Sequence, residues 1–192
     1  MSRDFTRRTF CASTAGFILP TWAIGGQGSG PIEAPFQRDY APPDFKPRWS
    51  KPQLSRLLVQ DFVIFAHSNL DMTKKLLDRE PRLNEAFMDW GAGDWESALG
   101  GASHMGRRDI VALLLERGAR MDIFCATMLG LLDAVKAMLT VEPKLIDARG
   151  PHGFTLHFHA QLAGKDADRM IEYLQSIKRI ELKPNPFVRP PE

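Results

Sequence analysis

Cysteine is scarce in this sequence, and its scarcity limits how the chain is stabilised and which chemistry it performs. Only Cys11 and Cys125 occur in 192 residues, and Cys11 lies in an N-terminal stretch with the features of a removable leader. Without Cys11 the chain cannot form a disulfide within itself. Cys125 follows the apolar Ile123 and Phe124, so we expect a buried structural thiol and not a reactive nucleophile.

An excess of charge of one sign is also missing. The chain has 25 Lys and Arg against 23 Asp and Glu, and its first 23 residues hold three of the arginines and one of the aspartates. Residues 24–192 therefore carry 22 basic and 22 acidic side chains. A balanced chain lacks the electrostatic footprint of a nucleic-acid-binding protein and is weakly attracted to anionic membranes. We expect no nucleic-acid partner.

The motifs of common cofactor and catalytic sites are absent. We find no glycine-rich phosphate loop after a strand, no paired cysteines at metal-ligand spacing and no heptad seam. Ser103, His104 and Asp109 are the residue types of a nucleophilic trio, but neighbours on a helix do not face each other and no nucleophile elbow is present. We therefore expect no catalytic residue, no cofactor and no enzyme activity.

The histidines are the next candidates for chemistry. His152, His157 and His159 lie close together in the sequence, with His104 further upstream. A zinc or haem site needs ligands that converge from several elements, whereas His157 and His159 point apart on a helix. We expect no metal site from this pattern.

The N-terminus has the order of an export signal. Arg7 and Arg8 are followed by Phe10, a weakly apolar run of about 13 residues and then small residues. This order resembles the signal peptide of the twin-arginine (Tat) route, which exports folded proteins. The run is well short of the roughly 20 apolar residues of a membrane span. The resemblance implies a signal at 1–23, cleavage after Ala23 and a periplasmic mature protein; a basic N-terminus with a chance arginine pair is the alternative.

Two proline-rich segments flank the rest of the chain. Six prolines fall within 22 residues of the segment 24–54, and four more fall within the segment 181–192. Proline at this density excludes regular helix and strand. We expect an extended linker at 24–54 and an extended C-terminal tail at 181–192, which leaves 55–180 as the folded domain.

A helical pattern recurs within 55–180. Apolar residues at helical spacing follow polar or acidic ones in four segments: 71–77, 109–115, 133–139 and 170–174. When the four segments are aligned on their first apolar residues, successive segments are 38, 24 and 36 residues apart, with a mean close to 33 residues. Repeats of about this length, each built from two short helices, indicate an all-α helical solenoid.

One stretch is more specific. Residues 97–119 follow the pattern T-P-L-H-x-A-A-x-x-G-x-x-x-I-V-x-L-L-L-x-x-G-A nearly position by position, and the sequence EPRL at 80–83 returns as EPKL at 142–145. The chain therefore resembles the ankyrin repeat family over about 55–180. The resemblance implies a short ankyrin-like solenoid of about four repeats, whose concave face and finger loops bind another protein without a cofactor.

The chain also departs from the family pattern. The spacing of 24 leaves the third unit without a finger, so that full fingers remain only at 89–96 and 147–154. Gly100 and Gly101 place two glycines in an inner helix, at a cost of roughly 1 kcal/mol each relative to alanine. We expect Asp109 to cap the following helix and Gly118 to end it.

The first finger has the composition of a binding surface. It presents Trp90, Asp94, Trp95 and Glu96 within one turn, and exposed tryptophans are favoured anchors for a partner. The other partner-binding candidates follow from neighbouring elements: His104, His152 and Phe154. The alternative is that the indoles pack against the linker or the first repeat.

These observations favour an exported ankyrin-like protein that binds an unidentified protein partner without catalysis. Two further hypotheses stay open. The export route and the histidines suggest a periplasmic metal- or cofactor-dependent protein. An accessory subunit that travels with a Tat-exported enzyme would use the same route without a site of its own.

Overall fold

The computed structural model describes residues 33–48 and 50–188 of the chain. The predicted export motif of Arg7, Arg8 and Phe10 lies outside these residues. The chain divides into two units, Met1–Asp44 and Phe45–Glu192, which are treated separately. In the first unit the described residues 33–44 form neither helix nor strand, as the proline content predicts.

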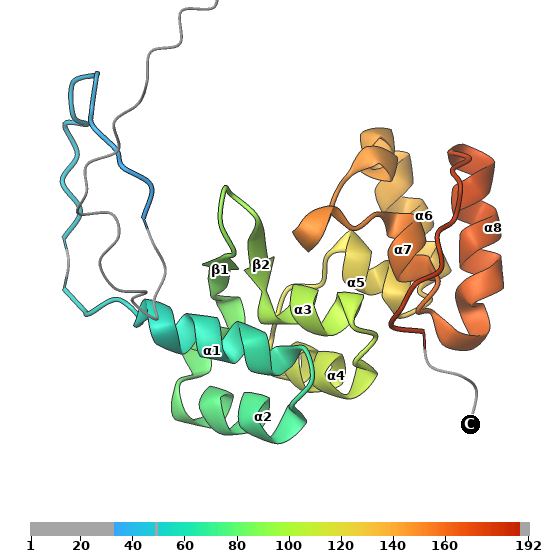
Figure 1. Ribbon diagram of the computed structural model, residues 1–192, viewed down its shortest axis with the longest axis horizontal. Helices are drawn as coiled ribbons and strands as arrows, with labels where there is room; N and C mark the ends of the chain where they lie inside the picture. The colour runs from blue at the N-terminus through green and yellow to red at the C-terminus, as the bar shows by residue number, and fades with distance from the viewer. Residues whose placement is uncertain (1–32, 49, 189–192) are drawn as a thin grey trace, which may run out of the picture. The chain divides into compact units, whose positions relative to one another are not determined.

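The second unit is predominantly helical (Figure 1), which confirms the helical class predicted from the sequence. Its helices, within the described residues, are α1 (Arg56–Ala66), α2 (Leu70–Arg79), α3 (Ala98–His104), α4 (Arg108–Glu116), α5 (Ile123–Met128), α6 (Leu132–Val141), α7 (Leu156–Ala160) and α8 (Ala167–Ile177). Short 3₁₀ turns are η2 (Pro81–Glu85), η3 (Pro143–Asp147), η4 (Pro151–Gly153) and η5 (Gly164–Asp166). None of these helices is long and apolar enough to cross a bilayer.

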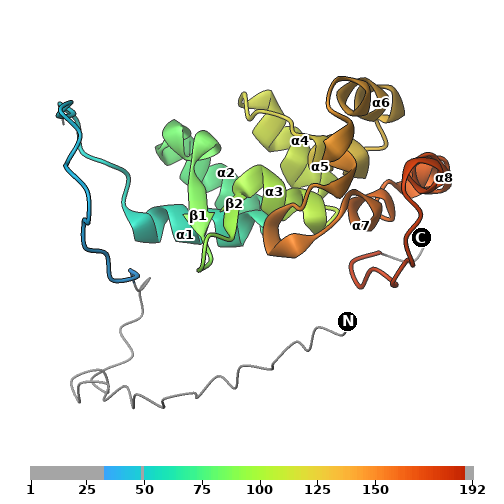
Figure 2. The same ribbon diagram turned by 90° about the horizontal axis from the view of Figure 1, so that it is seen from above.

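The helices pack in consecutive pairs. Helix α1 contacts α2, α3 contacts α4, α5 contacts α6, and α7 contacts α8. The first members of the pairs also contact each other in the order α1, α3, α5, α7 (Figure 2). All four segments with the recurring pattern lie within the second members, α2, α4, α6 and α8.

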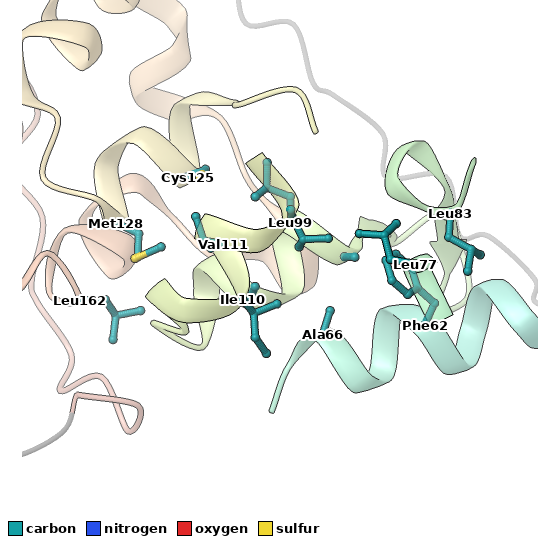
Figure 3. Close-up of a cluster of buried hydrophobic side chains, with 13 residues drawn as sticks. Phe62, Ala66, Leu77, Leu83, Leu99, Ile110, Val111, Cys125, Met128 and Leu162 are labelled. Carbon is teal, nitrogen blue, oxygen red and sulfur yellow. The ribbon is translucent and has the colours of Figure 1, made fainter. Parts of the chain in front are cut away.

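The core explains why the helices are arranged in this way. Helix α4 buries Ile110, Val111 and Leu114 completely, whereas Ala112 and Glu116 stay exposed. These apolar residues join a buried cluster with side chains from α1, α2, α3 and α5 (Figure 3). A helix with an apolar stripe of this width is stable only when neighbours cover it.

Four of the eight described helices have a side-chain cap at the N-terminus. Asn69, Ser97, Asp122 and Thr155 cap α2, α3, α5 and α7 by accepting a hydrogen bond from a first-turn amide. The prediction that Asp109 caps α4 is wrong. The helix starts at Arg108, which places Asp109 inside its first turn, and the carboxylate instead pairs with the Arg107 guanidinium at 2.7 and 2.9 Å.

The prediction for the other end of α4 is confirmed, because Gly118 has a φ of +91° there. Cys125 is buried as expected, and burial raises the pKa of its thiol to about 11. The predicted C-terminal tail contains no helix or strand within 181–188. This segment packs against the end of α7 through Asn185. The Asn185 side-chain amide donates to the Phe158 carbonyl at 3.0 Å, and the Asn185 backbone N–H donates to Gln161 Oε1 at 3.1 Å.

The first finger is a β-hairpin. Strands β1 (Phe87–Asp89) and β2 (Trp95–Ser97) are antiparallel, with Met88 opposite Glu96. Because strand side chains alternate between faces, Trp95 and Glu96 point in opposite directions. Trp95 is 59% exposed and Glu96 is fully buried. The hairpin therefore has one outward aromatic face and one face turned into the protein.

Candidate metal centre

Four ionisable side chains converge beside the inward face of the hairpin. His67, Glu96, His104 and His152 each offer one potential ligand atom, and these atoms all lie within 4.8 Å of one another. Glu96 Oε1 lies 3.1 Å from His104 Nδ1, while Glu96 Oε2 lies 3.3 Å from His67 Nε2 and 3.6 Å from His152 Nε2. The four residues come from the end of α1, from β2, from the end of α3 and from η4.

The imidazoles of His67 and His152 are each oriented by a hydrogen bond at Nδ1, the ring nitrogen that does not face Glu96. His67 Nδ1 lies 2.8 Å from the Val63 carbonyl oxygen, and His152 Nδ1 lies 2.8 Å from Asp94 Oδ2. A carbonyl and a carboxylate only accept, so Nδ1 carries the hydrogen and donates in both rings. The Nε2 atom of each ring then faces Glu96 Oε2, at 3.3 Å for His67 and 3.6 Å for His152. Metal-ligating histidines are oriented in the same way, by a carbonyl or carboxylate behind the ring.

Gly101 provides the space for His67. A Cβ at this position would lie 2.7 Å from Cε1 and 2.9 Å from Nδ1 of the His67 ring. No real Cβ approaches another atom so closely, so any side chain at position 101 would displace the imidazole. The glycine that weakens the inner helix is therefore required by the cluster.

The loop that carries His152 is strained. His152 has a φ of +57°, a left-handed conformation that is uncommon for residues other than glycine. Two hydrogen bonds to Asp94 hold His152 in this conformation. Oδ1 accepts from the His152 backbone N–H at 2.9 Å, and Oδ2 accepts from the His152 ring Nδ1 at 2.8 Å. Strain of this kind persists only where surrounding contacts overdetermine it, and it concentrates at functional sites.

Aromatic rings surround the polar cluster. The Trp90 indole N–H donates to Glu96 Oε2 at 2.7 Å, and its ring meets His67 and His152 edge-on at centroid distances of 5.9 and 5.4 Å. The Phe154 ring packs on His104 from the other side at 5.2 Å. The carboxylate thus lies in a weakly solvated, largely aromatic environment.

The burial of Glu96 demands a positive charge nearby. Burial by itself raises the pKa of this carboxyl, but the imidazoles of His104 and His67 overcome that effect and lower it to about 2. Burial likewise opposes protonation of His67, and the Glu96 carboxylate outweighs it, so the His67 pKa is raised. Glu96 Oε1 and His104 Nδ1 are both buried, and apart from their 3.1 Å contact with each other neither atom has a hydrogen-bond partner.

A divalent transition-metal ion matches this set of donors. Zinc binds imidazole nitrogen and carboxylate oxygen at about 2.0–2.2 Å, and a tetrahedron with such bonds has edges of about 3.3 Å. The contacts of Glu96 have similar lengths, 3.1 Å from Oε1 to His104 Nδ1 and 3.3 and 3.6 Å from Oε2 to Nε2 of His67 and His152, and the four potential ligand atoms all lie within 4.8 Å of one another. Imidazole with carboxylate also suits iron, cobalt and nickel. The cluster has the donor types and the spacing for one ion.

The structure places the predicted partner-binding residues in two different environments. Trp90, Asp94, Glu96, His104 and His152 all belong to this cluster. Glu96 and His104 are buried, so their side chains are not available to a partner. Trp95 stands on the outward face of the hairpin, and Phe154 is half-buried in a stack on Phe158 with centroids 4.0 Å apart.

The sequence pattern did not identify His67. The expectation of no metal site was argued from His157 and His159. His157 and His159 are outside the cluster: His157 Nε2 lies 3.0 Å from the Lys178 carbonyl oxygen and His159 Nδ1 lies 2.8 Å from the Thr155 carbonyl oxygen. The available signal was the pair of glycines in an inner helix, which implies that another group approaches the backbone closely.

His159 gives a separate, testable property. It is fully buried beside the Phe124 ring, and its Nε2 has no hydrogen-bond partner. Burial lowers its pKa from 6.5 to about 4; the bond to Thr155 opposes this shift, and the nearby His104 adds to it.

We therefore predict that His159 makes the protein acid-labile. Between pH 6.5 and 4 the unfolded chain binds a proton at this residue that the folded chain does not, so stability falls as the pH falls through this window. His159→Asn keeps a donor near the Nδ1 position and removes the titration. Between about pH 7.5 and about pH 4, the free energy of unfolding of wild type should fall by roughly 3 kcal/mol more than that of the variant, as measured by urea unfolding. Equal losses in the two proteins would contradict this assignment.

Comparison with known proteins assigns no residue of the cluster. No protein-family model matches the chain, and no curated protein is significantly similar to it.

Proposed function

We propose that this chain is an exported metal-binding protein that holds one divalent transition-metal ion between His67, Glu96, His104 and His152. The observation that carries the proposal is the pair of buried, unpartnered ligand atoms, Glu96 Oε1 and His104 Nδ1. Buried polar atoms are nearly always paired, and a metal ion would satisfy both at once.

A shared proton is the competing explanation, and it accounts for less. With Nδ1–H of His67 and of His152 directed to Val63 and Asp94, both Nε2 atoms face the Glu96 carboxylate. A single proton on one of these rings satisfies one contact with the carboxylate. A cation between them attracts all four ligands, because each offers a lone pair.

We further propose that the scaffold is an ankyrin-like solenoid and that the protein works in the periplasm. The serial pairing of α1/α2, α3/α4, α5/α6 and α7/α8 supports the repeat interpretation. The Arg7–Arg8 motif supports export by the Tat route. Because that route carries folded proteins, an ion bound before export would travel inside the protein.

Metal titration of the purified full chain tests the proposal. We expect one Zn²⁺ per chain by elemental analysis, with the affinity measured by competition against a chromophoric chelator. His67→Asn and His152→Asn each keep a donor for Val63 or Asp94 while removing Nε2, and asparagine tolerates the left-handed backbone at 152. Each should lower the affinity by about 100-fold, a loss at the upper end of the range for outer-shell partners.

His159→Asn is the matched control, because it makes the same substitution at a buried histidine outside the cluster and should leave affinity unchanged. Absence of stoichiometric binding by wild type would refute the proposal. An affinity that neither cluster variant changes would place the ion elsewhere.

A second function is favoured by the outward face of the hairpin. Trp95 and Phe87 are 59% and 55% exposed there, and the register places both on one face. They border a recess of about 250 Å³ that Phe124 and Arg149 also line. We propose this face as the docking surface for a protein partner, since aromatic anchors beside an arginine are typical of such surfaces. An accessory subunit of an exported enzyme would use the same face.

A further inference from the structure

The four proposed ligands are not buried to the same depth. The Glu96 and His104 side chains are 0% and 3% exposed, whereas those of His67 and His152 are 18% and 30% exposed. The cluster is therefore closed on the side of α3 and open on the side where η4 faces the end of α1. An ion bound there would have protein on one side and solvent on the other.

The part of the chain that the structure describes offers no further donor to cover the open side. Within the described residues, no other histidine, cysteine, aspartate or glutamate joins the group of four. Both oxygens of Asp94 are already used by His152. The Trp90 indole N–H is a donor and cannot bind a metal.

Trp90 also limits how Glu96 can bind. Its N–H occupies Oε2 at 2.7 Å, while Oε1 is unpartnered. This arrangement favours a carboxylate that binds the ion through one oxygen. Four single donors complete a tetrahedron, but cobalt, iron and nickel ions also accept five or six ligands. With such ions the remaining positions must be filled from outside the chain.

The charge of the site indicates what would fill these positions. A divalent ion with one carboxylate and three neutral imidazoles has a formal charge of +1, so a small anion can compete with water. The opening is bordered by the edge of the Trp90 ring, which is 5.9 Å from the His67 ring and 5.4 Å from the His152 ring between centroids.

We infer that the metal keeps an exchangeable coordination position beside Trp90 and His152, where it binds water or a small anion. This inference rests on the proposed metal site and gives it a Lewis-acid character. A purely structural site would instead be closed by its protein ligands.

Azide binding to the Co²⁺-loaded full chain tests the inference, because cobalt absorption in the visible range reports coordination number and geometry. We expect the weak absorption of a five- or six-coordinate ion and a saturable spectral change on addition of sodium azide. Intense absorption of a tetrahedral ion, unchanged by azide, would overturn the inference while leaving the metal site intact. Failure of Co²⁺ to bind in a 1:1 ratio would overturn both.

A pair of matched variants locates the position. Trp90→Phe keeps an aromatic ring but frees Oε2 of Glu96 to bind the ion as a second oxygen, so azide affinity should fall by about 10-fold. Trp95→Phe makes the same substitution on the outward face of the hairpin and should leave azide affinity within about 2-fold of wild type. Equal effects of the two substitutions, or none from either, would show that azide does not bind beside Trp90.

Discussion

Glu96→Gln is expected to lower the affinity for Zn²⁺ by more than about 100-fold, since it removes the only negative charge among the four proposed ligands. The glutamine keeps the size of the side chain and an oxygen that can accept from the Trp90 indole. It loses the charge that the three imidazoles surround at 3.1–3.6 Å. The measurement is the chelator competition used for the histidine variants.

The same substitution should have little effect on the metal-free protein. The neutral glutamine is no longer a buried carboxylate that requires a positive charge beside it. Zn²⁺ should therefore raise the melting temperature of wild type and not that of Glu96→Gln, because a ligand stabilises only the form that binds it.

Glu116→Gln is the control, because Glu116 is exposed on α4 and should keep full affinity. The opposing outcome is specific. If Glu96→Gln unfolds more easily without metal by about 3–5 kcal/mol and binds Zn²⁺ as wild type does, then Glu96 belongs to a structural ion pair.

Leu114→Ala is expected to destabilise the protein by roughly 2 to 5 kcal/mol. Leu114 is fully buried on α4, within the cluster that joins this helix to α1, α2, α3 and α5. Truncation would lose the transfer free energy of the removed atoms and leave a cavity that helices packed on several sides cannot close. Urea unfolding monitored by circular dichroism gives the change directly.

Leu57→Ala is the matched control, because Leu57 lies on α1 but is half exposed. It should cost less than about 1 kcal/mol, since a partly solvated side chain loses little on truncation. A similarly small cost for Leu114→Ala would be inconsistent with the packing of α4.

The helical elements could be read from the sequence because their causes are local. The four recurring segments lie inside α2, α4, α6 and α8, since apolar spacing along ten residues is enough to specify a helix with one buried side. Gly118 was identified by the same reasoning. The one local error, at Asp109, came from a helix that starts two residues earlier than expected, which moves the carboxylate from the cap into the first turn.

The metal cluster could not be read in this way. His67 and His152 are 85 positions apart in the sequence, and no spacing rule connects residues that meet only when α1, α3 and η4 pack together. The finger residues were singled out for their composition, but whether each one faces inward or outward was set by the strand register. That register buries Glu96 and exposes Trp95.

Gly101 shows most clearly the difference between what a local sequence pattern determines and what tertiary packing determines. From the sequence it was a helix-weakening residue with a cost of roughly 1 kcal/mol, and no local reason explained its presence. In the folded chain the His67 ring occupies the space that a Cβ would need. Local pattern thus determined the helices and their burial, whereas the site depends on side chains brought together by long-range packing, which a linear pattern does not encode.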